Sequence, residues 1–382
     1  MKMKKMMALV LTAAMITGMT ACSKAPEEKK SEPAAQTQTE TKGEAATDAA
    51  TEPAGEPEKV TISVHPSGHG LPAYIAEEKG WFKEEGLDVE TLVYISAPPQ
   101  MEAYASGAWE IGTTGFGGII LGVAKNDLKV IGVSIDDATV MGLWARNDSD
   151  IVKAGKDEKT GVYGTAAEWK DKEILLAQGT ITDVLLTATL EKLGMKDNEV
   201  VRTNMDASTA YTAFNSGSGD MVQANASFYF NALNEDWTAV TTGEAMDLFM
   251  PSAIIASEKI INERPQVVEK FTRAYMKGVE WIKENPEEAA QMLVDFCDEN
   301  GVATEYDNAL QFINMQIVKI PDTAGQLDLF GKAEGKDVTK WQDSLGRLMD
   351  YYITMGNYTQ EDKDLLLKDE NYVSTFMEDL QK

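Results

Sequence analysis

Short apolar segments alternate with amphipathic ones from Val60 to about residue 142. β-Branched and apolar runs at 60–64, 87–95, 109–115 and 128–136 predict strands. The segments 73–86, 101–107 and 116–127 have helical spacing, and Gly86 ends the first of them. The stretch 96–100 between them reads as a loop. This repeated strand–loop–helix unit predicts a parallel sheet with helices on both faces.

A second series follows a polar, irregular stretch at 148–172. Strands are predicted at 141–147, 173–180, 199–205, 220–226, 237–243 and 251–261, and helices at 182–194, 206–217 and 227–235. Beyond Pro265 the chain looks helical, with starts near Pro265, Pro286, Ala303, Lys336 and Thr359.

Two consecutive α/β series with a helical tail suggest two lobes joined by two crossings. The crossings are expected near 141–143 and 251–254. The first lobe is then 58–142 plus 252–382, and the second is 143–251. Because open α/β sheets bind ligands at the carboxyl ends of their strands, we expect a ligand cleft between the lobes.

The first 22 residues read as an export signal. Lys2, Lys4 and Lys5 precede an uncharged apolar stretch at 6–19, which is too short for a stable spanning helix. Residues 19–22, Met-Thr-Ala-Cys, resemble a bacterial lipobox with methionine in the usual leucine place, and imply acylation of Cys22. The alternative is a plain cleaved signal with a chance cysteine. We expect an extracytoplasmic protein, lipid-anchored to the outer face of the cell membrane.

Residues 23–57 are expected to form a disordered tether. They contain no aromatic residue and no Ile, Leu, Val or Met, so they cannot bury enough apolar surface to fold. The chain has a net charge of −27, and most of this charge lies on the folded body. Such an acidic protein repels phosphate backbones, so nucleic acid is a poor partner.

Few residues suit catalysis or metal binding. The two histidines, His65 and His69, lack a nearby third ligand, and Cys22 and Cys297 differ too much in context for a disulfide or a zinc site. Neither G-x-S-x-G nor a Walker A motif is present, and no complete G-x-G-x-x-G occurs. We therefore expect no cofactor, no metal and no catalysis. Cys297 and the tail aromatics are expected in the core.

Three segments resemble the nitrate/sulfonate/taurine-type substrate-binding proteins of ABC importers, a family with relatives that bind pyrimidine precursors of thiamine. They are GHGLPAYIAEEKGWFKEEGLDVE (68–90), APPQMEAYASGAWEIGTTGFGGIILGVAKND (97–127) and KDKEILLAQGTITDVLLTATLEKLGM (170–195). The resemblance covers roughly 60–290. It implies an α/β, type II periplasmic-binding-protein fold with two lobes, a two-strand hinge and a helical C-terminal tail. It also implies a monomer that closes on a small molecule and delivers it to a membrane permease.

One departure from the family concerns the ligand. Where many relatives have a Trp, an acid and a Pro, this chain has Asn225, Ala226 and Ser227, followed by Phe228. The pocket wall therefore differs, which argues against the usual sulfonate or nitrate.

Candidate ligand contacts follow the predicted strands. A helix amino end after the first strand offers free N–H groups, although His69 there could equally be an exposed loop residue. Gly115 permits close approach and Phe116 could stack on a planar ligand, although a plain strand-to-helix turn has the same geometry. The full set is Ser67, His69, Gly70, Thr113, Thr114, Phe116, Asp137, Gln178, Thr180, Thr182, Asn204, Asp206, Asn225 and Phe228.

Acidic residues gather at these strand ends. Asp136 and Asp137 end one strand and Asp206 follows another, while none of these loops carries Lys or Arg. This favours a neutral or cationic nitrogenous ligand, unless Asp137 and Asp206 are helix caps that point away. Thr180 or Thr182 can cap the next helix, and Asp183 in its first turn is expected to stabilise that helix.

Two other functions remain open. One is a surface sensor or adhesin lipoprotein on the same fold. The other is an enzyme resembling the thiamine-precursor synthases, whose cysteine-rich iron motif cannot be supplied by the one cysteine that remains after Cys22.

Overall fold

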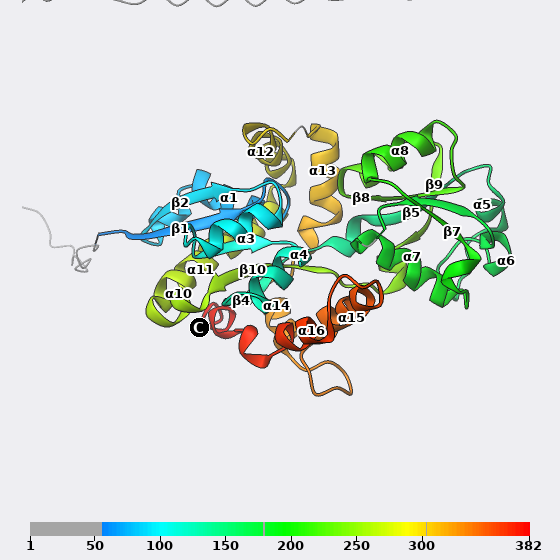
Figure 1. Cartoon of the computed structure of the whole chain (residues 1–382). Helices are drawn as coiled ribbons and strands as arrows, with labels where there is room; N and C mark the ends of the chain where they lie inside the picture. Colours follow the sequence, from blue (N-terminus) through cyan, green and yellow to red (C-terminus); the bar gives the residue numbers. More distant parts are fainter. Residues whose placement is uncertain (1–55, 179, 303) are drawn as a thin grey trace, which may run out of the picture. The chain divides into compact units, whose positions relative to one another are not determined.

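Two five-stranded sheets form the centre of the protein (Figure 1). The structure is a computed structural model that describes residues 56–178, 180–302 and 304–382, and these fall in one compact unit. The first sheet has the order β2 (Leu87–Val93), β1 (Glu58–Val64), β3 (Ile111–Thr114), β10 (Pro251–Ser257), β4 (Leu128–Asp136). The second has the order β7 (Val201–Asn204), β6 (Glu173–Leu176), β8 (Met221–Asn225), β5 (Met141–Arg146), β9 (Trp237–Thr242).

Both sheets are mixed where the sequence predicts a parallel sheet, because one strand in each runs the other way. β10 is antiparallel to β3 and β4, and β5 is antiparallel to β8 and β9. Met141 pairs with Asn225, so β5 starts where β8 ends, and Pro251 pairs with Asp136 in the same way. Each reversed strand is the one that arrives from the other sheet, and it enters at the carboxyl edge.

The chain passes between the sheets twice. The 3-10 turn η2 (Asp137–Val140) links β4 to β5, and residues 243–250, including η4 (Glu244–Met246), link β9 to β10. Both crossings therefore lie at the carboxyl ends of the strands, where ligands bind in open α/β sheets. The lobe boundaries expected above, 142/143 and 251/252, stay a prediction, since all described residues belong to one compact unit.

Helices flank both sheets and make up the C-terminal third. Those before the second crossing are α1 (Leu71–Glu78), α2 (Trp81–Glu84), α3 (Ala97–Ala105), α4 (Phe116–Ile119) with a π-helical turn (Ile120–Ala124), α5 (Asp150–Ala154), α6 (Ala166–Trp169), α7 (Ile181–Lys192), α8 (Ala207–Asn215) and α9 (Ala226–Leu233). Those after it are α10 (Glu258–Glu263), α11 (Pro265–Glu284), α12 (Pro286–Glu299), α13 (Tyr306–Met315), α14 (Thr323–Phe330), α15 (Lys340–Thr354), α16 (Gln360–Leu366) and α17 (Thr375–Asp379). None of the helices in the described ranges is long and apolar enough to cross a membrane.

Local chemistry explains where these helices differ from the prediction. Gly80 adopts a left-handed conformation (φ 76°) and divides the expected helix 73–86 into α1 and α2. The expected loop 96–100 is mostly the first turn of α3, whose early prolines fit the amino end of a helix. The expected strand 251–261 stops at Ser257, whose hydroxyl accepts a hydrogen bond from the N–H of Ile260 and caps α10.

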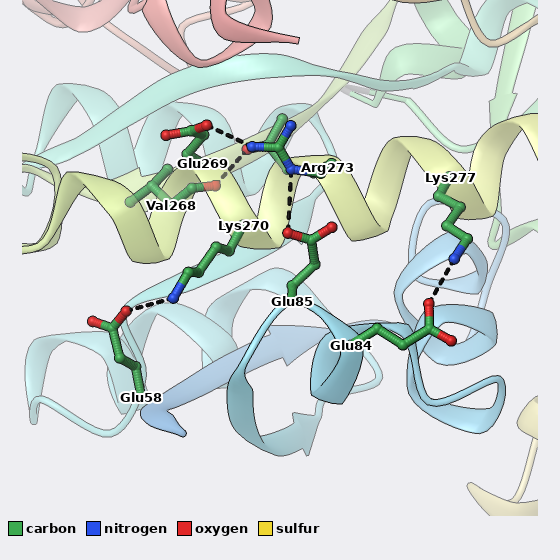
Figure 2. A network of polar contacts seen from close by, with 9 residues as sticks. Glu58, Glu84, Glu85, Val268, Glu269, Lys270, Arg273 and Lys277 are labelled. Atoms are coloured by element: carbon green, nitrogen blue, oxygen red, sulfur yellow. Dashed lines mark hydrogen bonds and ion pairs between the residues drawn. The ribbon is translucent and has the colours of Figure 1, made fainter. Parts of the chain in front are cut away.

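The long helix α11 fastens the tail to the first sheet. Its buried face carries Phe271 and Tyr275, in the core as expected from the sequence. Figure 2 shows ion pairs that α11 makes with the first part of the chain, where Lys270 reaches Glu58 at 2.8 Å and Arg273 reaches Glu85 at 3.2 Å. Because these pairs are partly exposed, each contributes only about 0–1 kcal/mol, and they orient α11 more than they stabilise it.

Candidate functional site

Gln100 joins the carboxyl ends of β1 and β3 through a buried hydrogen-bond network. Its Nε2 donates to Ser63 Oγ at 2.8 Å and to the Thr113 carbonyl at 2.9 Å. Its Oε1 accepts from Thr114 Oγ1 at 2.8 Å and lies 2.9 Å from His65 Nε2. A carbonyl can only accept, so the amide orientation is fixed and the His65 proton must sit on Nε2.

His69 lies beside this network and is buried, so the exposed-loop alternative is wrong. Its Nδ1 is 3.4 Å from Thr113 Oγ1, and its carbonyl accepts from the Tyr275 hydroxyl at 2.9 Å. Burial lowers the pKa of His65 to about 4 and lowers the pKa of His69 well below its usual value. Both rings are therefore neutral at pH 7. The described residues contain no cluster of three or more His, Cys, Asp or Glu that could hold a metal.

In the loop after β3, the backbone is more available to a ligand than the side chains are. Thr114 faces the Gln100 network, and Phe116 stacks on Tyr352 of α15 with ring centres 5.4 Å apart. A Cβ added at Gly117 would meet nothing within 4 Å, so the first turn of α4 is open on that side. A ligand at this loop would approach the backbone of Gly115 to Gly117.

Two adjacent acids tie the crossings together. Asp136 Oδ1 accepts from the N–H of Ala138 at 3.0 Å and of Met250 at 2.9 Å, so Asp136 caps η2. Asp137 does not act as that cap: its Oδ2 accepts from Ser252 Oγ at 2.8 Å. Burial raises the pKa of Asp137 to about 6. Its enclosed carboxyl group therefore holds a proton more firmly than an exposed one.

Gln316, which follows the last residue of α13, also contacts the first crossing. It was not among the residues singled out from the sequence. Its Nε2 donates to the Asp136 carbonyl at 2.9 Å, and the other end of the amide is the oxygen Oε1. That oxygen is buried without a hydrogen-bond partner. Asp137 accepts hydrogen bonds from Ser252 and Gln316, so the carboxyl group at this corner is held within the protein.

The expected contacts in the second sheet make hydrogen bonds within the protein. Gln178 donates its backbone N–H to Asn204 Oδ1 at 3.0 Å, which links the ends of β6 and β7. Thr180 donates to the Ala177 carbonyl at 2.8 Å. Asp206 accepts from the N–H of Thr209 at 3.0 Å, so it caps α8 as the alternative interpretation proposed. The side chain of Thr182 lies outside the described residues.

The end of β8 leads directly into α9. Asn225 is the last residue of that strand, and its side chain makes no capping hydrogen bond. Phe228 is partly buried, with its ring 5.5 Å from that of Tyr211. Of these two expected contacts, Asn225 is therefore the one with hydrogen-bonding capacity to offer.

A buried ion pair adds a positive charge that the sequence reasoning missed. Arg202 Nε lies 3.1 Å from Asp183 Oδ1, and Arg202 Nη2 lies 3.1 Å from Asp197. The strand-end loops do lack Lys and Arg, but Arg202 stands within β7, two residues before Asn204. Because two carboxylates already hold it, Arg202 is poorly placed to bind an anionic ligand as well.

A cavity of about 380 Å³ lies beside the β1–α1 loop. Ser67 and Gly68 of that loop line it, together with parts of α9, α12 and α13. A Cβ on Gly68 would lie 2.3 Å from the Phe312 ring, so glycine is needed for α13 to pack here. Gly70 is required similarly, because a Cβ there would lie 2.1 Å from the His65 carbonyl oxygen.

Comparison with known proteins decides the family. The model of the family described as NMT1/THI5 like matches residues 69–289, more than half of the chain. The chain belongs to this family. The structure is also similar to the periplasmic aliphatic sulphonate binding protein of Escherichia coli, with a TM-score of 0.64 at 14% identity over 82% of this chain and 92% of that one. The expected type II periplasmic-binding-protein fold is thereby confirmed.

Three curated relatives share part of the sequence. A putative aliphatic sulfonates-binding protein of Bacillus subtilis is 30% identical over 59% of this chain and 67% of its own length. A formylaminopyrimidine-binding protein of Halalkalibacterium halodurans is 22% identical over 76% and 84%. A 4-amino-5-hydroxymethyl-2-methylpyrimidine phosphate synthase of Aspergillus parasiticus is 25% identical over 71% and 80%.

Proposed function

We propose that this protein is the extracytoplasmic solute-binding component of an ABC importer, which captures a small molecule and delivers it to a membrane permease. The observation that carries the proposal is the arrangement of the two sheets. Each receives one reversed strand from the other, so both crossings lie at the carboxyl ends of the strands. The names of the binding-protein relatives support the same function.

The ligand that we propose is neutral or cationic and carries N–H donors. Asp137 places a partly exposed carboxyl group at the first crossing, and Arg202 is engaged by Asp183 and Asp197. A formylaminopyrimidine, the ligand named for one relative, has donors of this kind, whereas a sulfonate or nitrate has acceptors only.

Binding without catalysis fits these residues better than a synthase does. The two buried histidines are held neutral inside packing networks, and Cys297 is buried against the Pro66 carbonyl. The chain has two cysteines in all, so a cysteine-rich metal motif cannot be formed. A sensor or adhesin on this fold would still bind a ligand but would not deliver it to a permease.

A thermal-stability screen of the purified protein tests the proposal. We would compare formylaminopyrimidine and a primary aliphatic amine with nitrate and an aliphatic sulfonate. A ligand at a hundredfold excess over its dissociation constant adds about 2.7 kcal/mol of stability. If only nitrate or the sulfonate stabilised the protein, the proposed ligand class would be wrong. If no small molecule of any class bound, the transport function itself would be wrong.

A further inference from the structure

The two faces of the sheets are joined to one another in different ways. On the face that carries α4, α7 and α15, one cluster of buried apolar side chains extends from the first sheet to the second. Val133 of β4 and Leu176 of β6 both belong to it, and so do Leu345, Leu348 and Met349 of α15. Because a close-packed core resists both sliding and separation, this face holds the two sheets together.

Two adjacent tyrosines of α15 contact a helix from each sheet on this face. The ring of Tyr352 stacks on Phe116, the first residue of α4, with ring centres 5.4 Å apart. Tyr351 is partly buried beside the first turn of α7, where burial and then the negative charge of Asp183 raise the pKa of its hydroxyl. α15 therefore holds the amino ends of α4 and α7 in a fixed relation to one another.

The opposite face, which carries α9, α12 and α13, has two separate apolar clusters, one on each sheet. Among the described residues, Phe312 of α13 is the one apolar side chain that packs against both, and it is only partly buried. Its ring lies edge-on to Phe230 of α9 at 5.6 Å, and Asn308 Nδ2 donates to Asn231 Oδ1 at 3.0 Å. The cavity of about 380 Å³ lies beside these contacts, so the sheets are joined sparsely on this face.

We propose that the two sheets pivot on α15, so that the gap between α9 and α13 opens and closes while α15 stays in contact with α4 and α7. The inference rests on the proposed function, because a protein that binds its ligand between two sheets must open to admit it. It makes the helix starts of α4 and α7 a preassembled half of the ligand site. The β1–α1 loop and the start of α9 are then the parts that close over the ligand.

Distances between pairs of nitroxide labels, measured by double electron–electron resonance, test the pivot. With both native cysteines replaced by serine, one pair would join Thr212→Cys on α8 to Gln291→Cys on α12, and the other Glu191→Cys on α7 to Arg347→Cys on α15. All four positions are exposed. Without ligand, the α8–α12 distance should have two components that differ by more than about 2 Å, the scale of domain rearrangements, while the α7–α15 distance should be single and narrow. Saturating formylaminopyrimidine should leave only the shorter α8–α12 component and should not change the α7–α15 distance.

A matched pair of variants connects the movement to the contact between α9 and α13. Asn231→Ala removes the hydrogen bond to Asn308 and should shift the α8–α12 distances toward the longer component. Asn234→Ala is the control, because Asn234 donates to the Phe230 carbonyl of its own helix, and it should leave those distances unchanged.

The outcomes separate the pivot from the transport function. The pivot is wrong if both label pairs change alike, if the α7–α15 distance is the one that changes, or if Asn231→Ala and Asn234→Ala behave alike. A single α8–α12 distance in a protein that formylaminopyrimidine stabilises would overturn the pivot and leave the transport function standing. If no small molecule binds, the transport function is wrong, and the distances without ligand still decide the pivot, because two narrow distributions would overturn it.

Discussion

Asp137 accepts a hydrogen bond from the hydroxyl of Ser252 at 2.8 Å, and so joins the two crossings between the sheets. Asp137 opens the first crossing, and Ser252 lies just after the second. Asp136 repeats the connection through the N–H of Met250. Any change of lobe geometry at the crossings must therefore move or break these carboxylate contacts.

Asp137→Asn should stabilise the protein at neutral pH. The pKa of Asp137 is raised to about 6, so its contribution to stability is present below the unfolded pKa near 4 and is lost as pH rises through 6. The asparagine Oδ1 still accepts from Ser252. We expect a gain of up to about 3 kcal/mol at pH 7.5 that shrinks toward pH 4, measured by urea unfolding.

A gain independent of pH would contradict this account. Asp206→Asn is the matched control, because the pKa of Asp206 is lowered by the hydroxyl and N–H of Thr209. An asparagine caps α8 about as well as the aspartate, so this variant should show no gain at any pH.

His65 should act in the opposite direction over the same pH interval. Its pKa is lowered to about 4 in the folded state, so the unfolded chain takes up a proton near pH 6.5 that the folded chain refuses. Stability is therefore lost as pH falls from 6.5 toward 4, by up to about 3 kcal/mol.

His65→Gln keeps a donor for Gln100 and removes this titration. Relative to the parent protein, the variant should gain stability steadily as pH falls from 7 to 4.5 in urea unfolding. Comparing the stability of each variant with that of the parent protein separates the effect of His65 from that of Asp137. An unchanged difference across that range would show that His65 is not buried neutral.

Gln100→Leu should be strongly destabilising. It would leave the Thr113 carbonyl, the Thr114 hydroxyl and His65 buried without their partner. At about 1–3 kcal/mol for each unsatisfied group, we expect a loss of at least 3 kcal/mol. Gln291→Leu removes an exposed amide that bonds only Asp295 among the contacts found, and should cost less than about 0.5 kcal/mol. Equal losses in the two variants would contradict the importance of the network.

Local signals predicted much of the fold. Pro265 and Pro286 mark the first turns of α11 and α12, and Thr359 caps α16. The expected start at Ala303 lies outside the described residues, and α13 begins at Tyr306. The helix expected to start near Lys336 is α15, which starts at Lys340. The sequence did not predict α14, because its helical pattern of apolar residues is short.

Strand direction and long-range polar pairs could not be read from local pattern. An apolar strand has the same period in either direction, so the reversed β5 and β10 have no local signature. Gln100 looked like a loop residue, and its partners lie 13 to 37 residues away in the chain. Arg202 offered a usable signal, a positive charge within a predicted strand that follows a helix with Asp183 in its first turn.

Cys22→Ser should release the protein from membranes. Residues 1–55 lie outside the described part of the structure, so the lipobox remains a prediction from sequence. Two or three acyl chains on one residue would anchor the protein durably, since each buried methylene contributes about 0.8 kcal/mol. Fractionation of producing cells should find the parent protein with membranes and the variant in the soluble fraction. Cys297→Ser removes the other cysteine, which is buried, and should leave the protein on membranes. Membrane retention of Cys22→Ser at the parent level would eliminate the lipid anchor.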